Sequence, residues 1–188
     1  MRWLTRRGAV AALAVGLATV YGFGWRGLLL LLAFFVSSSL LSKATTRNHR
    51  QVLANGGVAA LAALAGNWTW FAGALAAATA DTWATEIGSH SRTLPRLITD
   101  GSRVPAGTDG GITPLGTAGG IAGAAFIAGL SFLLGQRTLL AIATGGVAGM
   151  TLDSLLGATV QGKVRWMNND AVNLAATLTG AACAVLIA

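Results

Sequence analysis

Charged residues are scarce in this chain, since Asp, Glu, Lys and Arg together make up 10% of its 188 residues. A typical soluble domain contains about 25% charged residues, and here hydrophobic residues make up 54% instead. The apolar stretches are too long and too numerous for a single soluble core to bury. The only cysteine, Cys183, lies in the last apolar segment, which excludes a disulfide framework. The composition therefore excludes an ordinary soluble domain.

The apolar stretches also decide between the two architectures that can span a bilayer. In hydrocarbon every backbone N–H and C=O group needs a partner inside the protein, which leaves helix bundles and closed barrels. Barrel strands alternate over about ten residues, whereas residues 28–36 and 119–134 are continuously apolar. Seven apolar segments can be drawn, at residues 9–23, 26–42, 52–66, 69–88, 113–134, 138–160 and 171–188. We predict one all-α domain over residues 1–188, a polytopic transmembrane helix bundle of about six to seven spans.

Small residues predict how these helices pack. The chain has 26 glycines, and small residues allow membrane helices to approach closely. The pairs Gly119/Gly123 and Gly145/Gly149 form two small-xxx-small faces, which predict a compact bundle. Met1–Val20 has the basic start and short apolar run of a signal peptide. Because no clear small-residue cleavage site precedes a soluble domain, we expect this segment to be retained.

Basic residues predict the orientation of the bundle. With the N-terminus inside, only Arg26 and Arg137 of the 13 Lys and Arg residues fall outside, a strong positive-inside bias. The net charge of +7 is then explained by contact of the basic residues with anionic lipid headgroups. Binding of nucleic acid is not indicated, because the sequence has no basic segment interleaved with aromatic residues. All six acidic residues fall on the same inner side, although they were not used to orient the chain. We predict a prokaryotic inner (plasma) membrane protein with a cytoplasmic N-terminus and site, which contacts membrane lipid.

Three carboxylates fall within predicted helices. A carboxylate in a membrane helix costs about 2.5–3.5 kcal/mol on insertion scales and usually faces a polar cavity or a partner. Asp81 and Glu86 lie about 140° apart around one helix, so a shared pocket would have to wrap around it. Asp153 heads a stripe with Gly157 and Gln161, and Gly157 leaves room for a ligand or another backbone. The alternative for Asp81 and Glu86 is that each pairs with a loop arginine near the interface.

Amide side chains gather at two predicted helix starts. Asn169 and Asn173 flank Asp170 at the last segment, although Asn169 or Asp170 could simply cap the helix. Gln51 and Asn55 lie at the start of the third segment, where capping or packing is again an alternative. Oxygen-rich clusters without a Cys–His ligand set favour Mg²⁺ over zinc.

The loop of residues 103–114 is a candidate phosphate-binding loop. Its glycines would allow backbone N–H groups to approach an anion before a helix N-terminus, and Arg103 or Arg96 would supply a counter-charge. The Walker pattern is absent, and a plain turn between helices is an equally good interpretation.

Four stretches together resemble a known family: residues 51–57, residues 80–88, residues 104–117, and residues 153–158 with 169–173. Their order and spacing resemble the integral-membrane family that includes plant phytyl-phosphate kinase and its uncharacterised bacterial and archaeal relatives, from about Phe34 to the C-terminus. The resemblance implies a prenyl-phosphate kinase, a phosphotransferase. It would use a nucleoside triphosphate, CTP or similar, to convert a polyprenyl or phytyl monophosphate to the diphosphate at the cytoplasmic membrane face.

Under this hypothesis, carboxylates from separate helices hold Mg²⁺ between phosphate groups. The predicted catalytic and metal-binding residues are Asp81, Glu86, Asp153 and Asp170. The predicted substrate- and nucleotide-binding residues are Lys43, Arg47, Gln51, Asn55, Arg103, Gly107, Thr108, Gly110, Gly111, Asn169 and Asn173. The alternative is a membrane transporter or lipid translocase that uses the carboxylates for ion or proton coupling. We find no internal repeat of the kind common in transporters; a non-catalytic scaffold is a third alternative.

Overall fold

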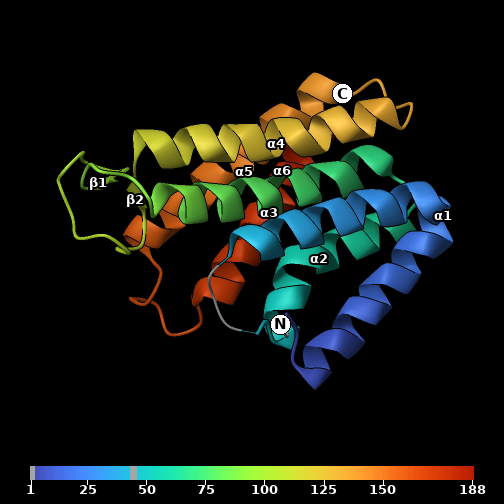
Figure 1. Cartoon of the computed structure of the whole chain (residues 1–188), viewed down its shortest axis with the longest axis horizontal. Helices are drawn as coiled ribbons and strands as arrows, with labels where there is room; N and C mark the ends of the chain where they lie inside the picture. The colour runs from blue at the N-terminus through green and yellow to red at the C-terminus, as the bar shows by residue number, and fades with distance from the viewer. Residues whose placement is uncertain (1–2, 43–45) are drawn as a thin grey trace.

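Helices make up most of the computed structural model, which describes residues 3–42 and 46–188 (Figure 1). Its helices are α1 (Arg6–Leu41), α2 (His49–Leu64), α3 (Trp68–Gly88), α4 (Pro114–Leu133), α5 (Leu139–Thr159) and α6 (Asn169–Ile187). Two short strands, β1 (Arg96–Leu97) and β2 (Gly111–Ile112), pair antiparallel in the connection between α3 and α4. The prediction of an all-α helix bundle is therefore confirmed.

Helix α1 joins two predicted segments across a sharp kink. Gly24 has φ +59° and ψ −146°, a backbone conformation that glycine adopts readily because it has no Cβ. The chain turns back at this point, so α1 consists of two limbs (Figure 1). The kink packs against the end of α2, since a Cβ on Gly22 would meet the backbone of Ala63.

Fewer helices than predicted qualify as membrane spans. Among the described residues, four helices are long and apolar enough to cross a bilayer: α1, α4, α5 and α6. The prediction of six to seven spans was therefore too high. Helix α2 has only 16 residues, against the roughly 20 that a spanning helix needs, and α3 carries Asp81 and Glu86.

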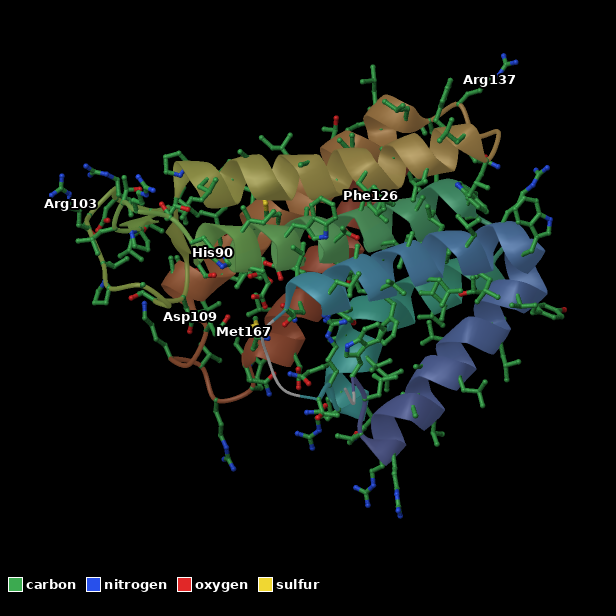
Figure 2. All side chains as sticks on the ribbon, in the orientation of Figure 1. His90, Arg103, Asp109, Phe126, Arg137 and Met167 are labelled. Carbon is green, nitrogen blue, oxygen red and sulfur yellow. The ribbon has the colours of Figure 1, made fainter. Side chains whose placement is uncertain are left out.

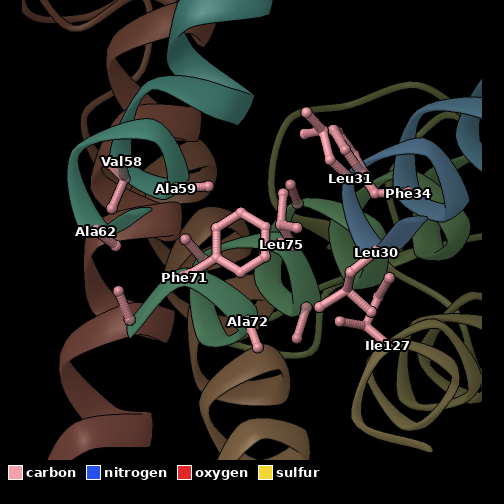
Figure 3. Packing of buried hydrophobic residues seen from close by; sticks show 14 of the residues in the cluster. Leu30, Leu31, Phe34, Val58, Ala59, Ala62, Phe71, Ala72, Leu75 and Ile127 are labelled. Atoms are coloured by element: carbon pink, nitrogen blue, oxygen red, sulfur yellow. The ribbon is translucent and has the colours of Figure 1, made fainter. Parts of the chain in front are cut away.

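Helix α3 forms the centre of the bundle. It packs against each of the other five helices, and every residue from Phe71 to Ala80 is buried. Figure 3 shows Phe71 and Leu75 of α3 beside residues of α2 and of the second limb of α1. A helix enclosed in this way is shielded from lipid by its neighbours, so it does not need the strongly apolar surface of a lipid-facing span.

The predicted small-residue faces are close helix contacts. A Cβ on Gly123 would lie 3.1 Å from the carbonyl oxygen of Thr79 in α3. A Cβ on Gly149 would lie 2.6 Å from the carbonyl oxygen of Ala176 in α6. Because a Cβ would be tight at Gly123 and would clash at Gly149, these glycines allow the close approach of α4 and α5 to their neighbours.

Candidate functional site

A polar cavity of about 580 Å³ lies at one end of the bundle. The C-terminal parts of α3 and α5, the N-terminal parts of α2, α4 and α6, and the connection that carries β1 and β2 all contribute to its wall. Its lining includes twelve of the residues predicted from the sequence: Arg47, Gln51, Asn55, Asp81, Glu86, Gly107, Thr108, Gly110, Gly111, Asp153, Asn169 and Asn173. The structure therefore brings together most of the predicted site.

Three predicted residues are not part of this lining. Asp170 and Arg103 are absent from the cavity wall, and Figure 2 shows Arg103 at the outer edge of the α3–α4 connection. Lys43 lies outside the described residues. Asp170 is instead an acidic residue in the first turn of α6, where it is favourable to the helix dipole. The structure therefore does not bring Asp170 and Arg103 into this cavity.

The carboxyl groups of Asp81 and Asp153 interact with each other across the contact between α3 and α5. The Oδ2 atom of Asp153 is buried and has no hydrogen-bond partner among the described residues. Asp109, from the connecting loop, adds a further electrostatic interaction with Asp153. Two carboxylates at one place repel each other unless a proton or a cation lies with them, so this pair can hold either a shared proton or a positive ion.

The predicted set of four metal-binding carboxylates is not assembled. Within residues 3–42 and 46–188, no three His, Cys, Asp or Glu side chains are close enough to hold one metal ion. Glu86 lines the cavity but interacts electrostatically with Arg47. This interaction agrees with the loop-arginine alternative for Glu86, whereas Asp81 interacts with another acid.

Among the described residues, Arg47 is the Lys or Arg side chain that lines the cavity. Its backbone is fixed by hydrogen bonds of 3.0 Å, one accepted from Thr5 N–H and one donated to Trp3 C=O. Its guanidinium donates to Ser39 Oγ at 3.2 Å and lies 5.9 Å from the centre of the Phe35 ring. Burial lowers the pKa of Arg47 and the charge of Glu86 opposes that change, but arginine remains protonated in proteins. A fixed positive charge therefore faces the cavity.

The two amide-rich helix starts have similar structures. Asn48 caps α2, and Gln51 Oε1 accepts a hydrogen bond of 3.0 Å from Asn48 N–H in a capping box. Asn168 caps α6 and accepts from Ala171 N–H at 3.1 Å. The expected cap at Asn169 or Asp170 is therefore one residue too late, and Asn169 lines the cavity instead.

The glycine loop docks on α5. Gly110 has φ +74°, and a Cβ there would meet the backbone of Ala158 and lie 2.6 Å from Ser154 C=O. Gly157 leaves room for the Gly110 backbone rather than for a ligand, since its Cβ would lie 2.8 Å from Gly110 N. The loop thereby closes one wall of the cavity.

The same connection is held together by its own contacts. The Arg96 guanidinium donates to Gly101 C=O at 2.7 Å. Asp100 accepts from Ser102 N–H at 2.9 Å, and hydrogen bonding to Ser102 lowers the pKa of the exposed Asp100 carboxyl. These contacts occupy both side chains in the turn.

Several lining residues were missed in the predicted site, among them Thr82, Thr85, Asp109, Thr151 and Ser154. Asp109 lies between two residues of the predicted phosphate loop, so its position in the sequence was a usable signal. The hydroxyl residues lie within four residues of Asp81 or Asp153 on the same helices, but a hydroxyl in a membrane helix also bonds its own backbone. Thr82 donates to Ala78 C=O in this way, which makes the residue type a weak signal.

A helical membrane protein with an acidic and amide-rich cavity at one end is the class that this fold and site define. The chain belongs to the family described as integral membrane protein DUF92, which matches residues 1–181. It is 37% identical to an uncharacterized membrane protein of Methanocaldococcus jannaschii, over 99% of this chain and 86% of that protein. It is 30% identical to an uncharacterized membrane protein of Synechocystis, over 97% of this chain and 81% of the relative. No solved structure is significantly similar to it.

Proposed function

We propose that this protein is a Mg²⁺-dependent kinase that phosphorylates a polyprenyl or phytyl monophosphate to the diphosphate. The donor would be CTP or another nucleoside triphosphate. The observation that carries the proposal is one cavity in which the Asp81–Asp153 pair lies with Arg47 and the glycine loop. Its volume of about 580 Å³ is within the roughly 300–1,000 Å³ of small-molecule sites.

The proposed reaction needs little activation of the acceptor. An oxygen of the prenyl monophosphate forms a bond to the γ-phosphorus of the nucleotide, and the bond from that phosphorus to the β–γ bridging oxygen breaks. The products are the prenyl diphosphate and the nucleoside diphosphate. Because the acceptor phosphate arrives ionised, the protein must mainly position two anions and offset their repulsion.

The carboxyl pair fits a magnesium site that is completed by substrate. Mg²⁺ in phosphotransferases is usually bound through one or two carboxylates together with substrate phosphates and water. Asp81 and Asp153 would supply the carboxylates, and the buried Asp153 Oδ2 without a hydrogen-bond partner supports this assignment. When bound there, the ion would neutralise negative charge on the phosphates.

The remaining polar side chains would orient the phosphates. Arg47 offers a guanidinium, which suits the geometry of phosphate oxygens. Asn55, Asn169 and Asn173 offer amide donors from the starts of α2 and α6. The glycine loop offers a backbone N–H group at Gly107, one of its lining residues, whereas the Gly111 N–H donates to Thr108 C=O within the loop.

We assign the cavity end to the cytoplasmic side of a prokaryotic plasma membrane, on the same charge bias that orients the sequence. Figure 2 shows Arg103 at the cavity end and Arg137, one of the two predicted outer arginines, at the opposite end. This orientation gives the site access to cytoplasmic nucleotide.

The test is transfer of label from γ-labelled CTP or ATP to a panel of prenyl monophosphates, with protein purified in detergent and Mg²⁺ present. We expect a labelled prenyl diphosphate, which is lost when EDTA is added. In sealed membrane vesicles, externally added nucleotide should support the reaction only when the vesicles are inside-out. No diphosphate from any acceptor and either nucleotide would refute the kinase, and uptake of substrate into proteoliposomes without product would favour a transporter.

A further inference from the structure

A second, apolar pocket of about 190 Å³ lies between the two limbs of α1 and helix α2. Ala12, Val15 and Gly16 line it from the first limb. From the second limb its wall includes Leu28, Leu31, Leu32, Phe34 and Phe35. The Gly24 kink creates this space, because it folds α1 back so that the two limbs and α2 surround it.

The apolar pocket adjoins the polar cavity. Four residues line both spaces: Arg47, Gln51, Asn55 and Thr82. Arg47 lies at this junction with its guanidinium beside the Phe35 ring and its charge facing Glu86. The apolar pocket and the polar cavity therefore meet at Arg47. The apolar pocket lies between α1 and α2, and α1 is a candidate membrane span.

We infer that the apolar pocket binds the headgroup-proximal part of a single hydrocarbon chain whose phosphate group lies in the polar cavity beside Arg47. This inference rests on the proposed function and adds to it the place where the lipid substrate is recognised. The apolar lining suits the hydrocarbon chain of a prenyl monophosphate, and the amide and cationic lining next to it suits the phosphate group at the end of that chain.

The size of the pocket limits what it can hold. An apolar cavity of roughly 150 Å³ is enough to bind benzene, so about 190 Å³ corresponds to one five-carbon prenyl unit with some room. Two acyl chains of an ordinary phospholipid do not fit side by side in this volume. The rest of a longer chain would extend into the bilayer. The pocket would therefore recognise the first prenyl unit of the chain and would not select for chain length.

Gly16 offers a position from which a side chain can be added into the pocket with room for its Cβ. It lines the apolar pocket, and a Cβ built there has no heavy atom within 4 Å. Gly57 of α2 has the same open surroundings but lines neither space. Gly16→Leu and Gly57→Leu are therefore a matched pair that add the same side chain to a helical glycine, inside and outside the pocket.

The test is equilibrium binding of farnesyl monophosphate and of inorganic phosphate to the full chain in phosphatidylcholine nanodiscs, without nucleotide. We expect Gly16→Leu to weaken farnesyl monophosphate binding at least about tenfold, since loss of two or three buried methylene contacts already has that effect. It should leave phosphate binding unchanged, and Gly57→Leu should change neither. A thermal unfolding midpoint equal to that of the wild type checks that the Gly16→Leu bundle is intact.

Unchanged farnesyl monophosphate binding in Gly16→Leu would overturn the inference, and so would an equal loss of both ligands or loss of the bundle's stability. Displacement of an ordinary phospholipid chain by Gly16→Leu, with no effect on farnesyl monophosphate, would also overturn it. Because no turnover is needed, the result is separate from the kinase assay. Chain-dependent binding without diphosphate synthesis would refute the proposed reaction and leave the lipid subsite standing.

Discussion

A few charged side chains line the polar cavity, and Arg47 is held in place among them by hydrogen bonds of both its backbone and its side chain. Its backbone is fixed to the N-terminal segment, its guanidinium donates to Ser39, and it lines both the polar cavity and the apolar pocket. A residue held at both backbone and side chain loses little conformational freedom when an anion binds. Arg47 is therefore the side chain to which we assign recognition of the lipid phosphate.

Replacing Arg47 should weaken binding of the monophosphate substrate. Hydrogen bonds to charged groups contribute about 1.5–3 kcal/mol, so Arg47→Gln should raise the KM for prenyl monophosphate roughly 10- to 100-fold. Arg50→Gln is the matched control, because Arg50 is exposed on α2 and lines neither space. Steady-state kinetics at saturating nucleotide measures the effect. Equal KM values for Arg47→Gln and Arg50→Gln would contradict the assignment.

The sequence predicted one metal site from four carboxylates, whereas the structure brings the carboxyl groups of Asp81 and Asp153 together. Asp81 and Asp153 were predictable because a carboxylate within a membrane helix requires a polar surrounding. The sequence did not show that Asp170 lies outside the cavity wall. The direction of a side chain in the first helical turn depends on the residue at which the helix begins. Asn168 rather than Asn169 caps α6, and a shift of one residue rotates the face by about 100°.

At the scale of elements, the α3–α4 connection closes the cavity through one close backbone contact. Gly110 and Gly157 meet without side chains between them, and Gly110 also requires a positive φ. The two strands fix the register of this connection through the pairing of Arg96 with Ile112. The position of the loop therefore depends on Gly110, a residue without a side chain.

Adding one methyl group at Gly110 should displace the loop. Gly110→Ala combines the unfavourable left-handed conformation, about 1–2 kcal/mol, with contacts to Ala158 and Ser154. Gly101→Ala is the control for the backbone cost, since Gly101 has φ +73° and nothing within 4 Å of its Cβ. We expect Gly110→Ala to lower the thermal unfolding midpoint more than Gly101→Ala and to reduce turnover as well. Indistinguishable turnover in these two variants would show that docking of the loop on α5 does not matter for the site.

The positions of the helices followed from the long apolar segments of the sequence, but the contact of each helix with lipid did not. All seven predicted segments coincide with helical stretches, because long apolar runs bounded by polar residues have few other structures in lipid. The sequence did not reveal that α3 is enclosed by the other helices. Hydropathy measures composition alone, so it treats a shielded helix and a lipid-facing helix alike.

At the scale of the whole molecule, the bundle separates a packed end from a polar end. At the packed end the Gly24 kink, the start of α3 and the end of α4 meet, with Phe23 and Trp68 rings 5.0 Å apart and Trp68 Nε1 donating to Ser131 at 2.7 Å. The cavity lies at the other end of α3, around Asp81 and Glu86. A site confined to one end suits a reaction at a membrane face better than passage of a solute across the bundle.

The most direct measurement of the central claim is metal-dependent phosphoryl transfer by Asp81→Asn, Asp153→Asn and Asp170→Asn, each compared with the wild type at equal thermal stability. The structure brings the first two carboxyl groups together and leaves the third outside the cavity. We predict that Asp81→Asn and Asp153→Asn each lower Mg²⁺-dependent turnover by about 100-fold or more, while Asp170→Asn retains nearly all of it. Near-normal turnover in either of the first two variants, or an equal loss in Asp170→Asn, would contradict the account.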